Sequence, residues 1–316
     1  MAQDAVFVGI DVSKIRLDVH VHPGGESFSV GNDATGIKQL GMKLLKLSPR
    51  GVGLEASGGY EKATAKGLCA KGLPVYIVDP AQVRSFALAL RRRAKTDAID
   101  AAVIARCLAA TIDALRPFAP DPSAERLSAL VGYRCRLIGE KTALLGYRDR
   151  VDDRLVLAMV ARQIAVLALR IATLDKAIAA CLAEHPRFAA QASLMRSAPG
   201  VGPVLAATLI AQLPELGQLD RRRIASLVGV APHARQSGQT DKGGKCSGGR
   251  KHVRNVLYMA ALSAVKAKKS PLWPFYNRLR QSGMAFKPAI VAVMRKLITI
   301  VNAMVRSQKT FQPTLV

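Results

Sequence analysis

Four carboxylates in the first third of the chain have the residue types of a divalent-metal site. Asp11 lies in or at the end of the apolar segment AVFVGIDV, and Glu55 ends the later segment GVGLEA. Asp97 and Asp100 lie three residues apart in KTDAIDA, where on a helix they share a face and repel each other. Carboxylates suit Mg²⁺ and Mn²⁺, and two such ions can hold the attacking and leaving oxygens of a phosphodiester. Either bound metal or the preceding Arg and Lys side chains would offset the repulsion.

Each of these carboxylates also has an ordinary structural alternative. An aspartate on a strand more often accepts hydrogen bonds than binds metal. Asp97 alone would serve as a charge that complements a helix dipole. For this reason we expect purely structural roles for Asp18, Glu61 and Asp79.

The elements that must position the carboxylates are strands and helices in alternation. The apolar, β-branched segments 5–12, 16–22, 51–56 and 73–80 predict strands. The segments with helical spacing are 35–47, 60–72 and 96–110, the last with Thr96 as a possible cap.

This order of elements predicts an α/β domain over residues 1–118, closed by the proline-rich segment RPFAPDPS. The carboxyl ends of strands meet at one edge of such a sheet, which is where sites usually form. We therefore expect Asp11 and Glu55 to meet there, and a helix packed at that edge to add Asp97 and Asp100.

Residues 119–190 predict a long helical segment with a heptad pattern. Apolar residues recur in steps of three and four at Leu157, Val160, Ile164, Leu167, Ile171, Leu174, Ile178 and Cys181. Two interpretations stay open: a helix of an internal bundle, or a coiled-coil arm used for self-assembly.

Residues 191–316 predict a mostly helical domain with a helix-hairpin-helix-like element at 196–213. Pro199, Gly200 and Gly202 allow a tight turn there, either to expose backbone N–H groups to phosphate or simply to join two packed helices. The glycine-rich segment 237–250 is too long for a tight turn, and loops of this size are usually functional or disordered.

The charge distribution indicates a polyanionic partner. The chain carries a net +25, and residues 196–316 hold 20 basic and 3 acidic residues. A solvated basic face is the alternative, but we expect phosphate contacts in this region. The candidate nucleic-acid-binding residues are Arg91, Arg92, Arg93, Lys95, Gly200, Gly202, Arg235, Lys245, Arg250, Lys251 and Arg254.

The remaining composition favours a cytoplasmic protein. The five cysteines are scattered without a C-x-x-C pair, which argues against zinc sites and disulfides. The N-terminal residues lack the features of a signal peptide, and we expect no membrane partner.

The segments GIDVSK, LEASGGY and KTDAIDA, in this order, resemble a RuvC-like (RNase H-like) fold and, more narrowly, the DEDD-type insertion-sequence transposases. These enzymes recombine DNA under the direction of a structured guide, or bridge, RNA. The resemblance implies that Asp11, Glu55, Asp97 and Asp100 are catalytic and bind Mg²⁺ (or Mn²⁺).

The segment LVGVAPHARQSGQTDKGGKCSGGRKHVRNVLYMAALSAV resembles the C-terminal transposase domain of the same family. The resemblance implies that Ser237 is the nucleophile. From the residues alone, Ser237 would be a turn residue like Ser247, and no Ser/His/Asp triad is evident. Activation would come from Lys and Arg or from the carboxylates and metal of the other domain. Relatives often have an acidic residue where this chain has Gln236.

Three functions follow. The first is a transposase that acts as a site-specific recombinase on donor and target DNA, as a dimer or tetramer. The second is a RuvC-like nuclease that cuts by water attack without a covalent intermediate. The third is a non-catalytic nucleic-acid scaffold. The DNA target itself is not encoded in the protein sequence if guide pairing reads it.

Overall fold

A computed structural model describes residues 5–90, 97–233, 236–237, 240–241 and 245–313; the side chains at 97–99, 233, 236–237, 240–241 and 245 lie outside this description. The chain forms two compact units, Met1–Pro120 and Asp121–Val316. The first is an α/β unit and the second is mostly helical, as the sequence predicts.

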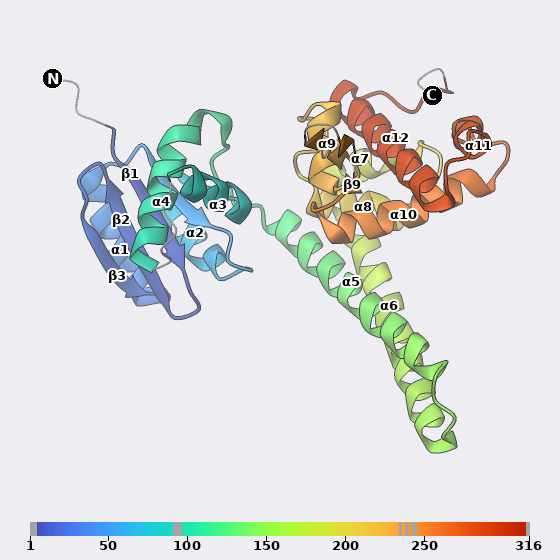
Figure 1. Ribbon diagram of the computed structural model, residues 1–316. Helices are drawn as coiled ribbons and strands as arrows, with labels where there is room; N and C mark the ends of the chain where they lie inside the picture. The colour runs from blue at the N-terminus through green and yellow to red at the C-terminus, as the bar shows by residue number, and fades with distance from the viewer. Residues whose placement is uncertain (1–4, 91–96, 234–235, 238–239, 242–244, 314–316) are drawn as a thin grey trace. The chain divides into compact units, whose positions relative to one another are not determined.

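The first unit is built on a mixed five-stranded sheet in the order β3-β2-β1-β4-β5 (Figure 1). The strands are β1 (Phe7–Val12), β2 (Arg16–His22), β3 (Ser27–Gly31), β4 (Gly51–Glu55) and β5 (Val75–Val78). The first three pair antiparallel, and β4 and β5 run parallel to β1. An antiparallel meander is thus joined to parallel strands through helical crossovers, in the α/β arrangement that the sequence predicts.

Helices cover both faces of the sheet. The helices of this unit are α1 (Ala34–Leu47), α2 (Glu61–Cys69), α3 (Pro80–Ala89) and α4 (Asp97–Thr111), followed by a 3-10 turn at Ile112–Ala114. One face of β1 carries Val8, Ile10 and Val12, which pack in one core with side chains of α1 and α2. The other face is covered by α4, which lies against β1 and β4 (Figure 1).

Two elements of this unit were absent from the sequence-based prediction. Strand β3 is short, contains two serines and lies at the sheet edge, so its pairing with β2 rather than its own apolar pattern makes it a strand. Helix α3 starts at Pro80 with Asp79 as N-cap, and only Val83 of its side chains is buried. A weak apolar face of this kind gives little periodic signal.

The second unit begins with an antiparallel pair of long helices, α5 (Pro122–Arg148) and α6 (Arg154–Glu184), which extends from the helical core as an arm (Figure 1). The predicted heptad seam of α6 faces α5 within the same chain: Leu167 and Ile171 pack on Leu137, and Ile178 and Cys181 pack on Leu127 and Val131. The internal interpretation of the seam is confirmed for these residues.

The core of the second unit is formed by α12 (Phe286–Ser307) and five shorter helices around it. The others are α7 (Pro186–Arg196), α8 (Pro203–Gln212), α9 (Arg221–Val228), α10 (Lys251–Lys266) and α11 (Trp273–Gln281). By length and composition, α6 and α12 would pass for membrane spans. Helix α12 is mostly the buried core of this unit, which explains its apolar character.

Candidate active site

Asp11 and Glu55 lie at the carboxyl ends of neighbouring parallel strands. Ile10 of β1 is opposite Leu54 of β4, so the next residue of each strand is a carboxylate. Side chains alternate along a strand, and Asp11 therefore shares the face of Gly9, as Glu55 shares that of Gly53. Both glycines contact α4. The two half-buried carboxylates thus belong to the face of the sheet that α4 covers.

Helix α4 approaches β1 so closely because residue 9 is glycine. A Cβ atom at Gly9 would lie 2.1 Å from the carbonyl oxygen of Ala101 and 2.4 Å from the amide nitrogen of Ala105. At the other end of the strand, Phe7 packs with Leu108 and Ile112. The amino-terminal end of α4 therefore points along β1 toward Asp11.

The predicted pair Asp97 and Asp100 belongs to that amino-terminal end. Asp97 is the first residue of α4, and Asp100 lies one turn further on and is half-buried. The side chain of Asp97, with Thr96, Arg91, Arg92, Arg93 and Lys95, lies outside the described residues. Among the side chains that are described, no three His, Cys, Asp or Glu residues form a metal-binding group. The oxygen-only donor set nonetheless fits Mg²⁺ or Mn²⁺.

The three carboxylates expected to be structural are confirmed as such. Asp18, directly across from Asp11 in the β1–β2 pair, is buried and accepts hydrogen bonds from Arg16 Nε at 2.9 Å and Ser29 Oγ at 2.7 Å. Glu61 accepts from the backbone N–H groups of Ser57 and Gly59, which orders the loop after Glu55. Asp79 caps α3 through the N–H of Ala81 at 2.6 Å.

Ser237 lies in a two-residue strand, one of four that the structure describes between residues 232 and 246. Pro232–His233 (β6) pairs antiparallel with Lys245–Cys246 (β9), and Gln236–Ser237 (β7) pairs with Thr240–Asp241 (β8). In the register, Ser237 is opposite Thr240. The side chains of Ser237 and Lys245, and all of Arg235, lie outside the described residues, so their predicted roles stay predictions.

The two ends of the serine loop meet at a glycine contact that sequence reasoning missed. A Cβ at Gly249 would lie 2.3 Å from the amide nitrogen of Gly229, and a Cβ at Gly229 would lie 2.3 Å from the carbonyl oxygen of Gly248. Both Gly229 and Gly249 have positive φ. We call this contact the loop neck. In the sequence, this contact is indicated only by a Val-Gly pair before the loop and a Gly-Gly pair at its end.

Two of the predicted phosphate-binding arginines have intramolecular partners at the loop neck. Arg250 forms a bidentate ion pair with Glu215, at 2.5 and 2.6 Å, and donates to the carbonyl of Gln212. Arg254 donates to the carbonyl of Gly248. These contacts fix the end of the loop, and a nucleic-acid contact by either residue stays a prediction.

Gly200, Gly202 and Lys251 are brought together on the second unit. The turn 197–202 joins α7 to α8, as the hairpin pattern predicts, and Gly200, with φ +80°, contacts the backbone of α10. All three residues line one groove between this turn, α5 and α10.

Comparison with known proteins covers both units. A family model for the DEDD transposases of IS110 elements, described as "Transposase", matches residues 8–147. A second, described as "Transposase IS116/IS110/IS902 family", matches residues 192–277. Together the two matches span more than half of the chain.

Individual proteins are similar at lower identity. Pilin gene-inverting proteins of Moraxella bovis and Moraxella lacunata are 28% identical over 323 residues, covering 96% of this chain and 97% of theirs. An insertion element IS116 protein of Streptomyces clavuligerus is 31% identical over 125 residues, 39% of this chain and 31% of that protein. The structure of T. thermophilus RuvC with a Holliday junction substrate matches at 19% identity and TM-score 0.30, covering 36% of this chain and 99% of that one.

The two family matches follow the order of the two units, and the carboxylate pattern and the serine loop lie within them. The chain belongs to the IS116/IS110/IS902 family of transposases, enzymes that cleave and transfer DNA strands.

Proposed function

We propose that the chain is the recombinase of an insertion sequence, with the four carboxylates as its metal site and Ser237 as its nucleophile. The observation that carries the proposal is the placement of Asp11 and Glu55 on neighbouring strand ends, on the face covered by a helix that begins at Asp97. Strand ends and a closely packed helix are rigid supports, as a site of several carboxylates requires.

Asp11, Glu55, Asp97 and Asp100 would hold Mg²⁺ or Mn²⁺, which when bound stabilises negative charge on the oxygens of the reacting phosphodiester. The contribution of the chain is the arrangement of the ligands. The contact of Gly9 with Ala101 sets the distance between β1 and α4, and therefore between the two pairs of carboxylates.

Ser237 is the proposed nucleophile toward DNA. Its Oγ–P bond forms as the bond from phosphorus to the leaving sugar oxygen breaks; the serine hydroxyl loses its proton to solvent and the leaving oxygen gains one from solvent. The sugar hydroxyl of another strand then attacks the phosphorus and loses its proton to solvent. The Oγ–P bond breaks, and the serine oxygen regains a proton from solvent, which completes the exchange. The resemblance at Ser237 supports this role, as does a surrounding region with 20 basic and 3 acidic residues.

The proposed partners are donor and target DNA and a structured guide RNA, in the cytoplasm. The basic C-terminal region supports a polyanionic partner. The family resemblance supports the guide RNA. The relatives named pilin gene-inverting proteins support DNA rearrangement as the outcome.

A dimer or tetramer is the proposed assembly. Helix α6 buries its seam on α5 but leaves Leu155 and Leu169 71% exposed and Met159 61% exposed. Exposed apolar side chains concentrated on one helix favour a protein contact. Changing Leu155 and Leu169 together to Asp should lower the mass measured by light scattering; an unchanged mass would refute this use of the helix.

The metal site is tested with Asp97→Asn. This variant should lose Mg²⁺-dependent cleavage of a plasmid that carries the gene with its flanking DNA, and should keep nucleic-acid binding. Asp79→Asn is the matched control, because asparagine also caps a helix and Asp79 lies outside the site. Full cleavage by Asp97→Asn would contradict the proposal. Cleavage by the unmodified chain without any protein–DNA adduct would favour the water-attack nuclease instead.

A further inference from the structure

The second unit contains a groove whose lining suits one nucleotide. It has a volume of about 860 Å³ and runs between α5, the turn 197–202 with the start of α8, and α10. Small-molecule sites commonly measure about 300–1,000 Å³, so the groove can hold a single nucleotide but is too small for duplex.

The charge of the groove favours a phosphate. Among the residues that the structure describes, no Asp or Glu lines it, whereas Lys251 and His252 do. The helices α8 and α10 both start at the groove, and neither has a side chain capping its first turn. Their N–H groups and dipoles add to the positive potential.

The remaining lining favours a base. Ile138 on α5 and Met259 on α10 are exposed apolar side chains, 39% and 62% exposed. Thr142, Asn255 and Ser263 supply hydrogen-bonding groups between them in the lining. An apolar surface beside a few polar groups and a cationic end matches an unstacked base attached to its phosphate.

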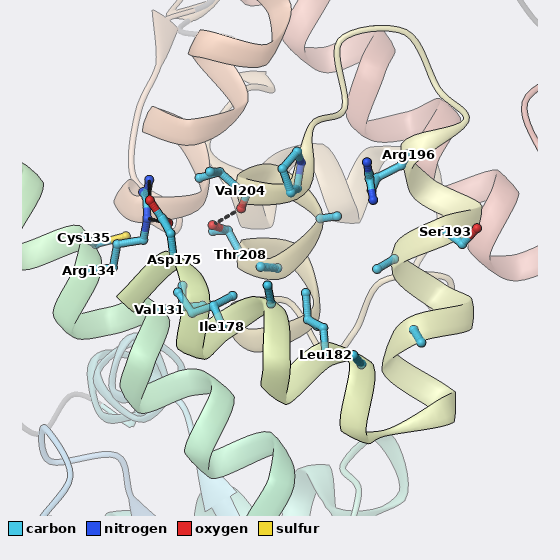
Figure 2. Close-up of a pocket in the computed structure, with 17 residues that line it drawn as sticks. Val131, Arg134, Cys135, Asp175, Ile178, Leu182, Ser193, Arg196, Val204 and Thr208 are labelled. Carbon is cyan, nitrogen blue, oxygen red and sulfur yellow. Dashed lines mark hydrogen bonds and ion pairs between the residues drawn. The ribbon is translucent and has the colours of Figure 1, made fainter. Parts of the chain in front are cut away.

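A neighbouring cavity makes a useful contrast. This cavity lies between α5, α6, α7 and α8 (Figure 2). It has a volume of about 540 Å³ and shares Arg134, Cys135 and Val204 with the groove. Asp175 lines this cavity and pairs with Arg134 at 2.5 Å, which neutralises the guanidinium. Arg134 also lines the groove, and because Asp175 neutralises it, the positive charge of the groove comes from Lys251 rather than from Arg134.

We propose that the groove binds one unpaired nucleotide of a single-stranded segment, with its phosphate near Lys251 and its base beside Ile138 and Met259. This inference rests on the proposed function in requiring a nucleic-acid partner. The same chemistry is present in an RNA loop and in an opened DNA strand, and the experiment separates the two.

Glycines on α5 allow a matched test. Gly139 lines the groove and Gly146 lies two turns further along the same helix outside it; a Cβ at either position meets nothing within 4 Å. Gly139→Leu therefore fills the groove without disturbing the helix, and Gly146→Leu makes the same change elsewhere. Both replacements favour the helix by about 1 kcal/mol, so both variants should fold.

The measurement is the Kd of the full chain for labelled 12-nucleotide oligo(U), oligo(dT) and a 20-base-pair DNA duplex. Gly139→Leu should weaken binding of a single strand by roughly 5- to 150-fold, the range for one stacked base, and leave duplex binding within about twofold. Gly146→Leu should change neither. Weaker binding of oligo(U) alone assigns the groove to RNA, and weaker binding of oligo(dT) alone assigns it to an opened DNA strand. Weaker binding of both means that the groove accepts a nucleotide from either.

Crosslinking of the unmodified chain gives an independent readout. Oligo(U) with 5-iodouridine, or its deoxy counterpart, should crosslink to α10 near Tyr258 and Met259. Unchanged single-strand binding by Gly139→Leu, equal loss with duplex, or crosslinks outside α5 and α10 would overturn the inference while leaving the proposed function standing. Absence of any nucleic-acid binding by the unmodified chain would instead overturn both.

Discussion

Gly9→Ala should reduce DNA cleavage without touching any proposed catalytic residue. The new Cβ would lie 2.1 Å from the Ala101 carbonyl oxygen, whereas ordinary contacts begin at 3.4 Å, so α4 must move by more than about 1 Å. Overpacking of this kind destabilises a fold by about 1–3 kcal/mol. A displacement of about 1 Å in a catalytic arrangement can lower the rate by about 10²-fold.

The assay is the initial rate of plasmid cleavage in Mg²⁺, with thermal unfolding measured in parallel. Gly53→Ala is the matched control on the same face, because its Cβ meets only the side chains of Ile104 and Leu108, at 3.3 Å, which can adjust. It should cost about 1 kcal/mol or less and keep most of the cleavage rate. A folded Gly9→Ala variant that cleaves at the normal rate would refute the claim that the β1–α4 spacing sets the site.

Three further predictions concern the second unit. Gly249→Ala places a Cβ atom 2.3 Å from the backbone nitrogen of Gly229, at a residue with positive φ. It should therefore lower the free energy of unfolding by about 1–3 kcal/mol and reduce the rate of strand joining. Gly248→Ala is the control: its Cβ meets nothing within 4 Å, so its effects in thermal unfolding and in the joining assay should be milder. Glu215→Gln breaks the bidentate pair with Arg250, in which both side chains are about one-third exposed. It should lower the free energy of unfolding by about 1 kcal/mol and slow strand joining more than cleavage of the first strand. Equal slowing of the two steps would contradict a positioning role for Arg250. The backbone N–H of Ala124 and the guanidinium of Arg187 lower the pKa of Asp121. The stability that Asp121 contributes is therefore complete above its unfolded-state pKa and is lost as pH falls through the lower folded-state pKa. Asp121→Asn should flatten this part of an acid unfolding curve, and an unchanged curve would refute the prediction.

The sequence was sufficient to predict most of the first unit. The apolar runs of β1 and β4 and the spacing of α4 are strong local patterns, and strand order brings their carboxylates to one edge. It was insufficient for β3 and α3, whose conformation depends on neighbours. The tight β1–α4 contact was equally hidden, because Gly9 is one glycine among 25.

The second unit shows a different limit. The heptad pattern of α6 defined which face is buried, but not that α5 of the same chain covers it. The loop neck and the Glu215–Arg250 pair join residues 20 to 35 positions apart, and no local pattern encodes such contacts. The two-residue ladders around Ser237 are too short to have a period at all.

The central claim is tested most directly by denaturing electrophoresis of end-labelled DNA from the flanks of the gene, incubated in Mg²⁺ with the full chain and RNA transcribed from those flanks. The unmodified chain and Ser247→Ala should leave a fraction of the DNA covalently attached to protein. Ser237→Ala should leave none while it still binds RNA and DNA. An adduct that persists in Ser237→Ala and disappears in Ser247→Ala, or DNA cut by the unmodified chain with no adduct at all, would contradict the account.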